Sequence, residues 1–222
     1  MDLKLKKYLE QANCWPSNGK HILAQYDDNS IVVYQAYRPE IGLFASENQY
    51  FGGAFSYSRM SWIKPNFLWM MYRSGWGTKV GQEITLAIRL KRSFFENILL
   101  NAVSSSFHSS AKTKIEDWRE ALQNSNVRLQ WDPDHDPFGA KQERRAIQLG
   151  LRNDMLAPFE GDGIIDIQDI SKFVANQRSF VEENRLHELE TPFESVYEPK
   201  DISRLDEIGL TTYFRKPTLN RR

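Results

Sequence analysis

The run Ile-Val-Val-Tyr-Gln-Ala-Tyr at residues 31–37 constrains the fold of this chain more than any other feature. Its side chains are almost all apolar, β-branched or aromatic, which is typical of a strand that is buried on both faces. Such a strand needs packed structure above and below it. It ends at Arg38-Pro39, and a helix is expected to begin there because proline is tolerated in the first helical turn. Arg38 is therefore predicted to lie at a strand-to-helix corner.

Other segments show strand and helix patterns in no strict order. Residues 83–90 alternate apolar and polar side chains, which predicts a half-buried strand, and residues 127–131 and 147–151 do the same. Residues 67–72 are apolar on most sides and are followed by a glycine-containing segment, which predicts a short buried helix. This mixture favours the α+β class over a doubly wound sheet.

The chain is predicted to form one domain, and its 222 residues suit one large domain. Residues 1–184 are expected to form an α+β globular domain, in which helices pack on a mixed, mostly antiparallel sheet that is either continuous or split. Residues 185–222 are polar and interrupted by prolines. They are therefore predicted to form a loosely packed C-terminal extension of the same domain.

Composition excludes several classes of function. The 29 Lys and Arg residues balance 29 Asp and Glu, so no global field attracts the chain to nucleic acid or to an anionic membrane. Cys14 is the single cysteine, so neither an intramolecular disulfide nor a cysteine-based metal cluster can form. No apolar run approaches the roughly 20 residues that span a bilayer. We therefore expect a cytoplasmic protein without a membrane partner, and the oligomeric state is left open.

The stretch from Arg59 to Glu83 has the strongest pattern of a binding site, because aromatic and cationic residues are interleaved in it. Aromatic faces can stack on a base or nicotinamide ring while cations hold phosphates. Trp69 lies among apolar residues and is predicted to belong to the core. The expected binding residues are Arg38, Trp62, Lys64, Tyr72, Arg73, Ser74 and Trp76.

Each of these residues also has a purely structural interpretation. Arg38 can form an ion pair or cap a helix instead of binding a ligand, although its planar fork suits a phosphate or a carboxylate. Arg73, Ser74 and Trp76 lie where a predicted helix ends, and their polar groups must face some partner. We predict that Arg38, Arg73 and Trp76 line one common cleft.

The segment Asp132-Pro133-Asp134-His135-Asp136-Pro137 allows two interpretations. Alternate aspartates with a histidine could hold a hard cation, which would suit a metal-dependent hydrolase. The segment lacks the central glycine and the closing glutamate of a calcium-binding loop, and Asp-Pro pairs commonly form turns. A turn is therefore the preferred interpretation, and no metal cofactor is expected.

A glutamate candidate for catalysis lies at Glu143, in a charged cluster that leads into the strand predicted at residues 147–151. At a loop-to-strand junction its carboxylate could face a cleft and stabilise positive charge that develops on a sugar. The sequence does not decide whether Glu143 or Glu83 faces the cleft. Neither of the common glycine-rich phosphate-binding loops is present in the sequence.

The chain resembles the uncharacterised domain-of-unknown-function family 4291. The resemblance rests on Tyr37-Arg38-Pro39, on the tryptophan-rich block from Arg59 to Trp76, on Gln130-Trp131-Asp132-Pro133, and on Arg145-Ala-Ile-Gln-Leu-Gly-Leu-Arg152. It implies a single-domain cytosolic protein and no established activity.

A more distant similarity is to the ADP-ribosyltransferase fold, in which a small split sheet holds NAD in a cleft. One branch of that fold carries an arginine on an early strand, a serine in a middle segment, and a Gln/Glu-x-Glu sequence in a late loop. Arg38 matches the first position, and Ser61 or Ser74 matches the second. Gln142-Glu143 matches the third, although the residue x that separates the two side chains in Gln/Glu-x-Glu is missing here.

This similarity implies an ADP-ribosyltransferase-like protein that binds NAD or a related nucleotide between Arg38 and the Arg59–Glu83 block. Glu143 and Arg38 would carry the chemistry. The alternative is a non-catalytic nucleic-acid-binding module that uses the same block for base stacking and phosphate contacts. The sequence therefore leaves open whether the protein is an enzyme.

Overall fold

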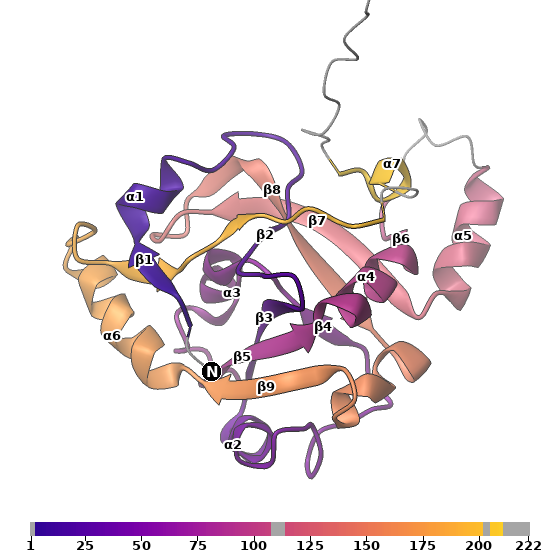
Figure 1. The fold of residues 1–222 in the computed structure, drawn as a ribbon, viewed down its shortest axis with the longest axis horizontal. Coiled ribbons are helices and arrows are strands. Elements are labelled where there is room, and N and C mark those ends of the chain that lie inside the picture. Colours follow the sequence, from indigo (N-terminus) through magenta and orange to yellow (C-terminus); the bar gives the residue numbers. More distant parts are fainter. Residues whose placement is uncertain (1–2, 108–113, 202–204, 211–222) are drawn as a thin grey trace, which may run out of the picture.

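Two larger β-sheets, of three and of four strands, form the centre of the molecule (Figure 1). The computed structural model describes residues 3–107, 114–201 and 205–210. The strands are β1 (Leu5–Lys7), β2 (Leu23–Ala24), β3 (Ser30–Tyr37), β4 (Ser61–Ile63), β5 (Ile84–Lys91), β6 (Ala102–Ser104), β7 (Val127–His135), β8 (Lys141–Leu151), β9 (Ile164–Asp169), β10 (Glu190–Pro192) and β11 (Ser195–Val196). The helices are α1 (Tyr8–Ala12), α2 (Pro39–Asn48), α3 (Phe67–Ser74), α4 (Arg92–Leu100), α5 (Ile115–Asn124), α6 (Ser171–Glu182) and α7 (Leu205–Ile208), with short 3₁₀ turns η1 (Asn153–Met155) and η2 (Ala157–Glu160).

The sheets confirm the predicted α+β class with mostly antiparallel pairing. One sheet has the order β3-β5-β9 and the other the order β4-β8-β7-β6, and in these two sheets only β6 and β7 run parallel. Two further antiparallel pairs, β1 with β10 and β2 with β11, join the N-terminal part of the chain to residues 190–196. Within the described ranges, no helix is long and apolar enough to cross a membrane.

Strand β3 is covered on both faces, as its apolar sequence predicts. Val32 and Tyr34 pack into a cluster with α3 and α6. Ile31 and Val33, on the opposite face, pack into a second cluster with α4 and the four-stranded sheet. Because successive side chains of a strand point to opposite faces, one strand lies between two cores.

The two sheets meet at a single backbone pairing between β3 and the residue that follows β4. The amide of Tyr34 donates to the carbonyl of Lys64 over 2.7 Å, and the amide of Lys64 donates back over 3.2 Å. Beyond this pairing β3 and β4 diverge. The side chain of Gln35 bridges the gap, because its Nε2 donates to the carbonyl of Trp62 and to Oγ of Ser61. The predicted sheet is therefore the split one.

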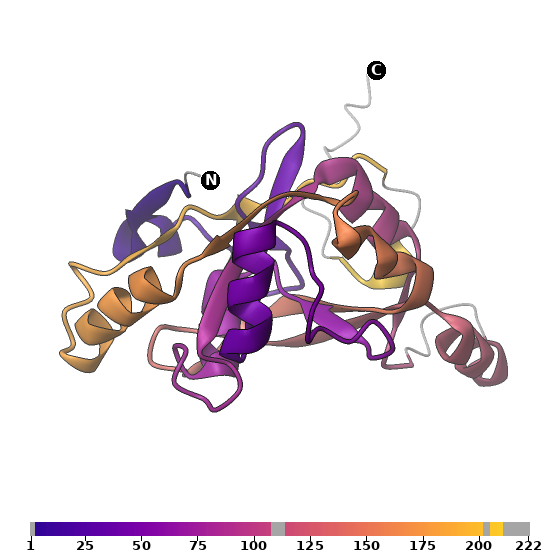
Figure 2. The same cartoon turned by 90° about the horizontal axis from the view of Figure 1, so that it is seen from below.

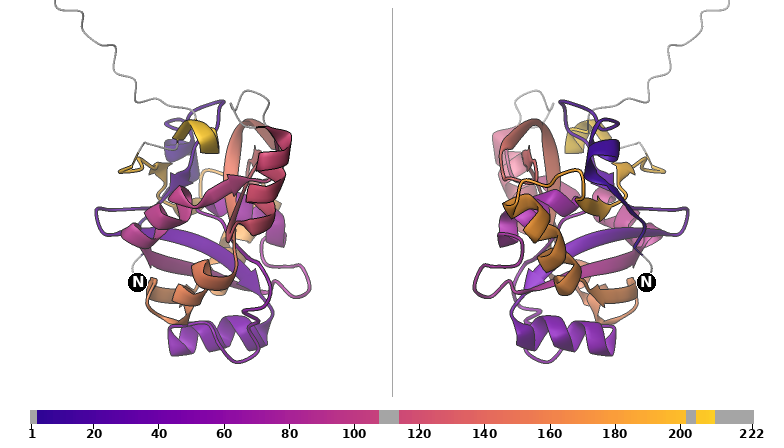
Figure 3. Two further views of the ribbon diagram at one scale, coloured as in Figure 1. Left: turned by 90° about the vertical axis from the view of Figure 1, so that its right-hand side faces the viewer. Right: turned by 90° about the vertical axis from the view of Figure 1, so that its left-hand side faces the viewer.

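The helices place side chains at this divergence. Helix α2 begins at Pro39, directly after β3, and lies beneath β5 and β9 (Figures 2 and 3). Helix α3 begins where Oδ1 of Asn66 accepts the amide of Trp69 over 2.6 Å, and it ends at Gly75, whose φ of 59° is left-handed. Helix α5 lies at one end of the molecule, away from this region, whereas α6 lies toward the opposite end and packs on the face of β3 that carries Tyr34 (Figure 1).

The C-terminal segment is packed more tightly than its composition predicts. The expected loose extension over residues 185–222 is wrong for the part described up to Asp201, because Leu189, Thr191 and Tyr197 are fully buried. Glu194 is also buried, and its carboxylate accepts the amide of Phe67 at the start of α3 over 2.7 Å. Burial raises the pKa of this carboxyl well above its usual value. Polar residues in this segment form hydrogen bonds inside the protein, which composition alone does not reveal.

The Asp-Pro segment, predicted as a turn, is a turn only in its last part: residues 132–135 belong to a strand, and Asp136-Pro137 lie in the connection that follows. Strand β7 continues through Pro133 to His135, and β8 begins at Lys141. Proline is tolerated at this position because β6 pairs only with residues 127–129 of β7, so the proline lacks a neighbour that needs its amide. The turn between the strands is closed by Asp136, whose Oδ1 accepts the amides at positions 138 and 140.

Trp69→Ala is expected to lower the free energy of unfolding by about 3–5 kcal/mol, because a buried tryptophan is truncated. Trp69 is 7% exposed and stacks near Tyr72 and His135, with ring centroids 5.4 and 5.3 Å away. Urea titration measures the loss. Tyr72→Ala is the matched control and should cost less, since Tyr72 is 41% exposed. An unchanged midpoint for Trp69→Ala would contradict this assignment to the core.

Candidate functional site

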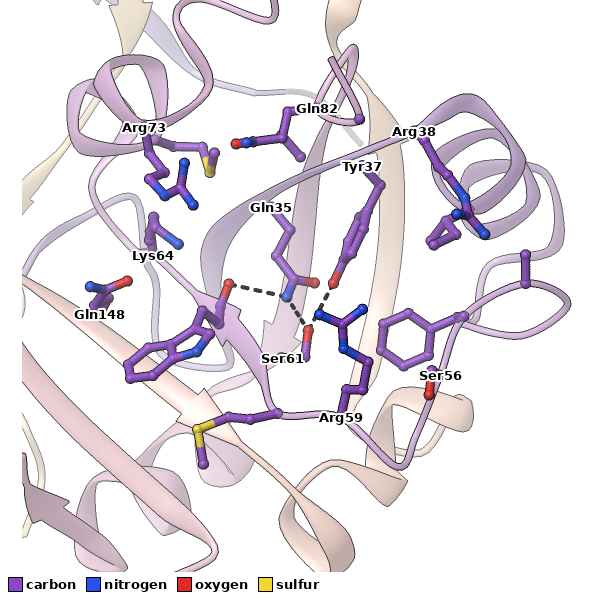
Figure 4. Close-up of a pocket in the computed structure, with 18 residues that line it drawn as sticks. Gln35, Tyr37, Arg38, Ser56, Arg59, Ser61, Lys64, Arg73, Gln82 and Gln148 are labelled. Atoms are coloured by element: carbon purple, nitrogen blue, oxygen red, sulfur yellow. Dashed lines mark hydrogen bonds between the residues drawn. The ribbon is translucent and has the colours of Figure 1, made fainter. Parts of the chain in front are cut away.

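A cavity of about 780 Å³ opens where β3 and β4 diverge (Figure 4). Its volume lies within the roughly 300–1,000 Å³ typical of small-molecule sites. The end of β3, the loop before β4, β4 itself, α3, the loop before β5, and β8 all contribute to its wall. The lining residues are Gln35, Ala36, Tyr37, Arg38, Ile41, Ala54, Phe55, Ser56, Arg59, Met60, Ser61, Trp62, Lys64, Met70, Arg73, Gly81, Gln82 and Gln148.

The charge of this lining is entirely positive. Arg38, Arg59, Lys64 and Arg73 contribute four cations, and the lining contains no carboxylate. Figure 4 shows Lys64 and Arg73 on one side of the cavity and Arg38 on the other. Nε of Arg38 forms an ion pair with Glu40 over 3.4 Å, but both side chains are more than half exposed, so the pair is weak. A concave site lined by one sign of charge attracts ligands of the opposite sign.

Lys64 differs from the three arginines because it is buried. The arginines lie at the exposed rim, whereas Lys64 is 5% exposed. Burial, the larger cause, and the positive charge of the nearby Arg73 guanidinium together lower the pKa of its amine to about 8, while Asp132 opposes the shift. The backbone of Lys64 is held by both hydrogen bonds to Tyr34. The side chain of Lys64 therefore extends from a fixed backbone position, where the two sheets diverge.

A hydrogen-bonded network fixes the polar wall of the cavity. The carbonyl of Trp62 can only accept, so the atom of Gln35 that contacts it must be Nε2. The same Nε2 donates to Oγ of Ser61 over 2.8 Å, and that oxygen also bonds to the hydroxyl of Tyr37 over 2.8 Å (Figure 4). Burial raises the pKa of Tyr37 far above its usual value, so the hydroxyl stays neutral. On the opposite wall, Nε2 of Gln148 donates to Asp132 over 2.7 Å.

The remaining wall is apolar and includes Phe55, Met60, Trp62 and Met70. The Trp62 indole packs directly over Gly150 of β8. A Cβ at this glycine would lie 2.9 Å from Cε2 of Trp62 and 2.6 Å from the sulfur of Met60. The glycine therefore leaves the space that the indole occupies, which is a known role of glycine inside strands.

Four of the seven residues predicted to bind a ligand lie together in the cavity, namely Arg38, Trp62, Lys64 and Arg73. Helix geometry separates the others. Met70 and Arg73 are three residues apart on α3 and both face the cavity, whereas Tyr72 faces β7 and stacks on His135 with ring centroids 3.5 Å apart. Adjacent helical residues cannot share a face, so the block divides between two surfaces.

Ser74 and Trp76 also lie outside the cavity lining. Ser74 is fully buried, and its hydroxyl donates to the carbonyl of Met70 over 3.0 Å. The indole of Trp76 donates to the carbonyl of Pro137 over 3.1 Å and packs edge-on against Phe67. The predicted common cleft therefore contains Arg38 and Arg73 but not Trp76.

Neither glutamate candidate is among the lining residues. Strand β8 begins at Lys141, so the loop-to-strand junction expected at Glu143 is absent. Glu143 lies inside the strand, and its side chain is exposed. Glu83 bonds back to the amide of Gly81, at the edge of the cavity. The sequence did not reveal Gln35 or Gln148 as site residues, although a glutamine within the apolar run at 31–37 is a signal that could have pointed to the first.

The aspartates of β7 have separate partners. Asp132 accepts from Gln148, Asp134 forms a buried ion pair with Arg144, and His135 stacks on Tyr72. Within the described residues, no group of three or more His, Cys, Asp or Glu is arranged to hold a metal ion. The geometry of this segment therefore gives no support to the metal-dependent hydrolase.

Comparison with protein families places residues 21–197 within one profile, described as a domain of unknown function (DUF4291). This range contains every residue that lines the cavity. A search among curated proteins found none that matches the chain. The resemblance drawn from the sequence motifs is thus confirmed, and the similarity to ADP-ribosyltransferases stays a prediction.

Gly150→Ala is expected to cost about 1–3 kcal/mol of stability, because the added methyl group forces the Trp62 ring away from β8. The measurement is a double-mutant cycle with Trp62→Leu by chemical denaturation. If the ring is the obstacle, most of the cost of Gly150→Ala should vanish in the Trp62→Leu background. Equal costs in both backgrounds would contradict the proposed contact.

Proposed function

We propose that this chain, which belongs to the DUF4291 family, binds NAD or a related nucleotide in the cavity between β3 and β4. The observation that carries the proposal is a lining with four cations and no carboxylate. An anionic ligand would neutralise this cluster, which otherwise holds like charges around one concave space. Phosphate groups are the suitable partners, because guanidinium forks bind their oxygens in pairs.

The other lining groups suit the rest of a nucleotide. The indole of Trp62 and the ring of Phe55 provide apolar area for a base or nicotinamide ring. Gln82 and Gln148 bring amide groups that can bond to ribose hydroxyls or to base edges. A few polar groups on a largely pre-formed wall are typical of sites for small ligands.

The support stops at binding. ADP-ribosyl transfer through Glu143 requires a carboxylate close to the bond that breaks. Glu143 is exposed on β8 and lies outside the lining. The transferase activity expected from the sequence therefore stays a prediction, and nucleotide binding is the part of it that the cavity favours.

A nucleic-acid-binding module is less favoured by the geometry. Stacking of successive bases needs aromatic faces along one open track. Trp69 is buried, Tyr72 stacks on His135, and the indole nitrogen of Trp76 bonds to a backbone carbonyl. These rings do not line the surface that carries the cations, so a short ligand inside the cavity fits the arrangement better.

Arg38→Ala and Arg73→Ala should each weaken nucleotide binding by roughly 10- to 150-fold, since a charge-assisted hydrogen bond contributes about 1.5–3 kcal/mol. Calorimetric titration with NAD and with ADP measures the affinity. Arg119→Ala is the charge-matched control, because Arg119 is exposed on α5 and does not line the cavity. The proposal fails if wild-type protein binds neither nucleotide at millimolar concentration. Tight, salt-sensitive binding of oligonucleotides would then favour the nucleic-acid alternative.

The affinity for a nucleotide is expected to fall as the pH rises through about 8, the pKa of Lys64 in the free protein. An anionic ligand prefers the charged amine, so binding is strongest below this pKa and weakens once the amine loses its proton. The arginines stay charged throughout. Titrations between pH 6.5 and about 9.5, which brackets the pKa, should show the decline in wild type and a flat profile in Lys64→Met. An equal decline in both proteins would exclude Lys64 as its source.

A further inference from the structure

Lys64 presents an amine that has no protein partner inside the cavity. Its side chain is 5% exposed, and no described residue forms a hydrogen bond or an ion pair with its Nζ. Nζ itself is not fully enclosed by protein atoms, and Lys64 is part of the cavity lining. The amine is therefore reachable from the cavity while the rest of the side chain is covered.

The surroundings fix the backbone from which this amine extends. The amide and the carbonyl of Lys64 both form hydrogen bonds with the backbone of Tyr34. The apolar side chains of Met70 and Trp62 line the same cavity. Figure 4 shows the Lys64 amine and the Arg73 guanidinium directed toward the same space. A ligand whose anionic group contacts Arg73 would thus bring its neighbouring atoms against Nζ.

The same surroundings favour the form of the amine that reacts. Burial and the positive charge of Arg73 both disfavour protonation of Lys64, and its pKa falls to about 8. A lysine placed in a covered site beside another cation is a nucleophile near neutral pH, because part of the population carries a free lone pair. Among the described lysines, Lys20 also has a pKa lowered by burial and by a neighbouring arginine, but it does not line the cavity.

We propose that Lys64 forms a reversible imine with the carbonyl carbon of a phosphorylated aldehyde or ketone held by Arg73. The lone pair of Nζ attacks the carbonyl carbon as the carbon–oxygen π bond opens, and a proton passes from the nitrogen to the oxygen to give a neutral carbinolamine. Loss of water from the carbinolamine leaves the carbon–nitrogen double bond, and addition of water reverses the sequence. No oxidant or reductant is needed. ADP-ribose belongs to this substrate class, since its terminal ribose opens to an aldehyde.

The inference rests on the anion-binding cavity of the proposed function. Pyridoxal 5′-phosphate is the probe, because it carries an aldehyde and a phosphate, and pyridoxal is the probe without the phosphate. Because the free hydroxyl of pyridoxal adds to its own aldehyde, the rate of each probe at Lys64 is expressed relative to its rate at the exposed Lys172. The full-length protein is treated with each probe across a range of pH and reduced with borohydride, which converts an imine into a stable amine. Peptide mass spectrometry then identifies the labelled lysine and gives its rate.

Lys64 is expected to be labelled at least about tenfold faster than exposed lysines at neutral pH. Its pKa of about 8 instead of 10.5 raises the neutral fraction by roughly two orders of magnitude, because each unit of pKa changes this fraction about tenfold. Lys64→Arg should abolish this fast label and keep the fold, as a thermal melt can verify. Lys172→Arg, at an exposed position on α6, should leave the label unchanged. Arg73→Met should slow labelling by pyridoxal 5′-phosphate more than labelling by pyridoxal, and should move the pH profile upward.

Labelling of Lys64 no faster than that of Lys172 would overturn the proposal. So would a rate at Lys64 that does not depend on the phosphate of the probe. NAD is included as a competitor so that the two proposals are separated. Nucleotide binding without a fast label leaves the proposed function standing and removes the imine. A fast, phosphate-dependent label that NAD does not suppress supports the imine and counts against the NAD site.

Discussion

Two backbone hydrogen bonds between Tyr34 and Lys64 decide where this protein has a site. They join the three-stranded and four-stranded sheets at one point, and the strands diverge directly beyond it. A split between strands leaves backbone groups without a ladder partner, and such groups are costly when buried. Gln35 meets this requirement by donating to the carbonyl of Trp62 and to Ser61. The gap is thereby stabilised as a cavity instead of closing into a continuous sheet.

The C-terminal segment supports this site from the far side of α3. The buried carboxylate of Glu194 accepts the amide of Phe67 and contacts Asn66, the residue that caps the helix. Hydrogen-bond acceptors are favourable at the N-terminus of a helix, where backbone amides lack partners, and a cation such as Arg73 is favourable in its last turn. One end of α3 is therefore held by the C-terminal segment, and the other presents Arg73 to the cavity.

The net charge of the chain is zero, but its positive and negative side chains are separated around the cavity. Acidic residues near the site are turned away or paired: Asp134 with Arg144, and Asp132 with Gln148. The cavity keeps four cations, of which one is buried. Overall composition cannot reveal such a cluster, because a field of one sign inside a cleft depends on which side chains converge there.

Local patterns in the sequence determined the strand at residues 31–37, the helix that starts at Pro39, the apolar helix after Asn66 and the corner position of Arg38. These features depend on periodicity and on a few residues that begin or end an element, and neighbours along the chain set both. Only the tertiary structure decided that Gln35 and Gln148 line the cavity, that Tyr72 faces away from Arg73, and that Glu143 lies outside. Those outcomes depend on how far β8 extends and on where the two sheets diverge. Contacts between segments that are distant in the sequence decide both.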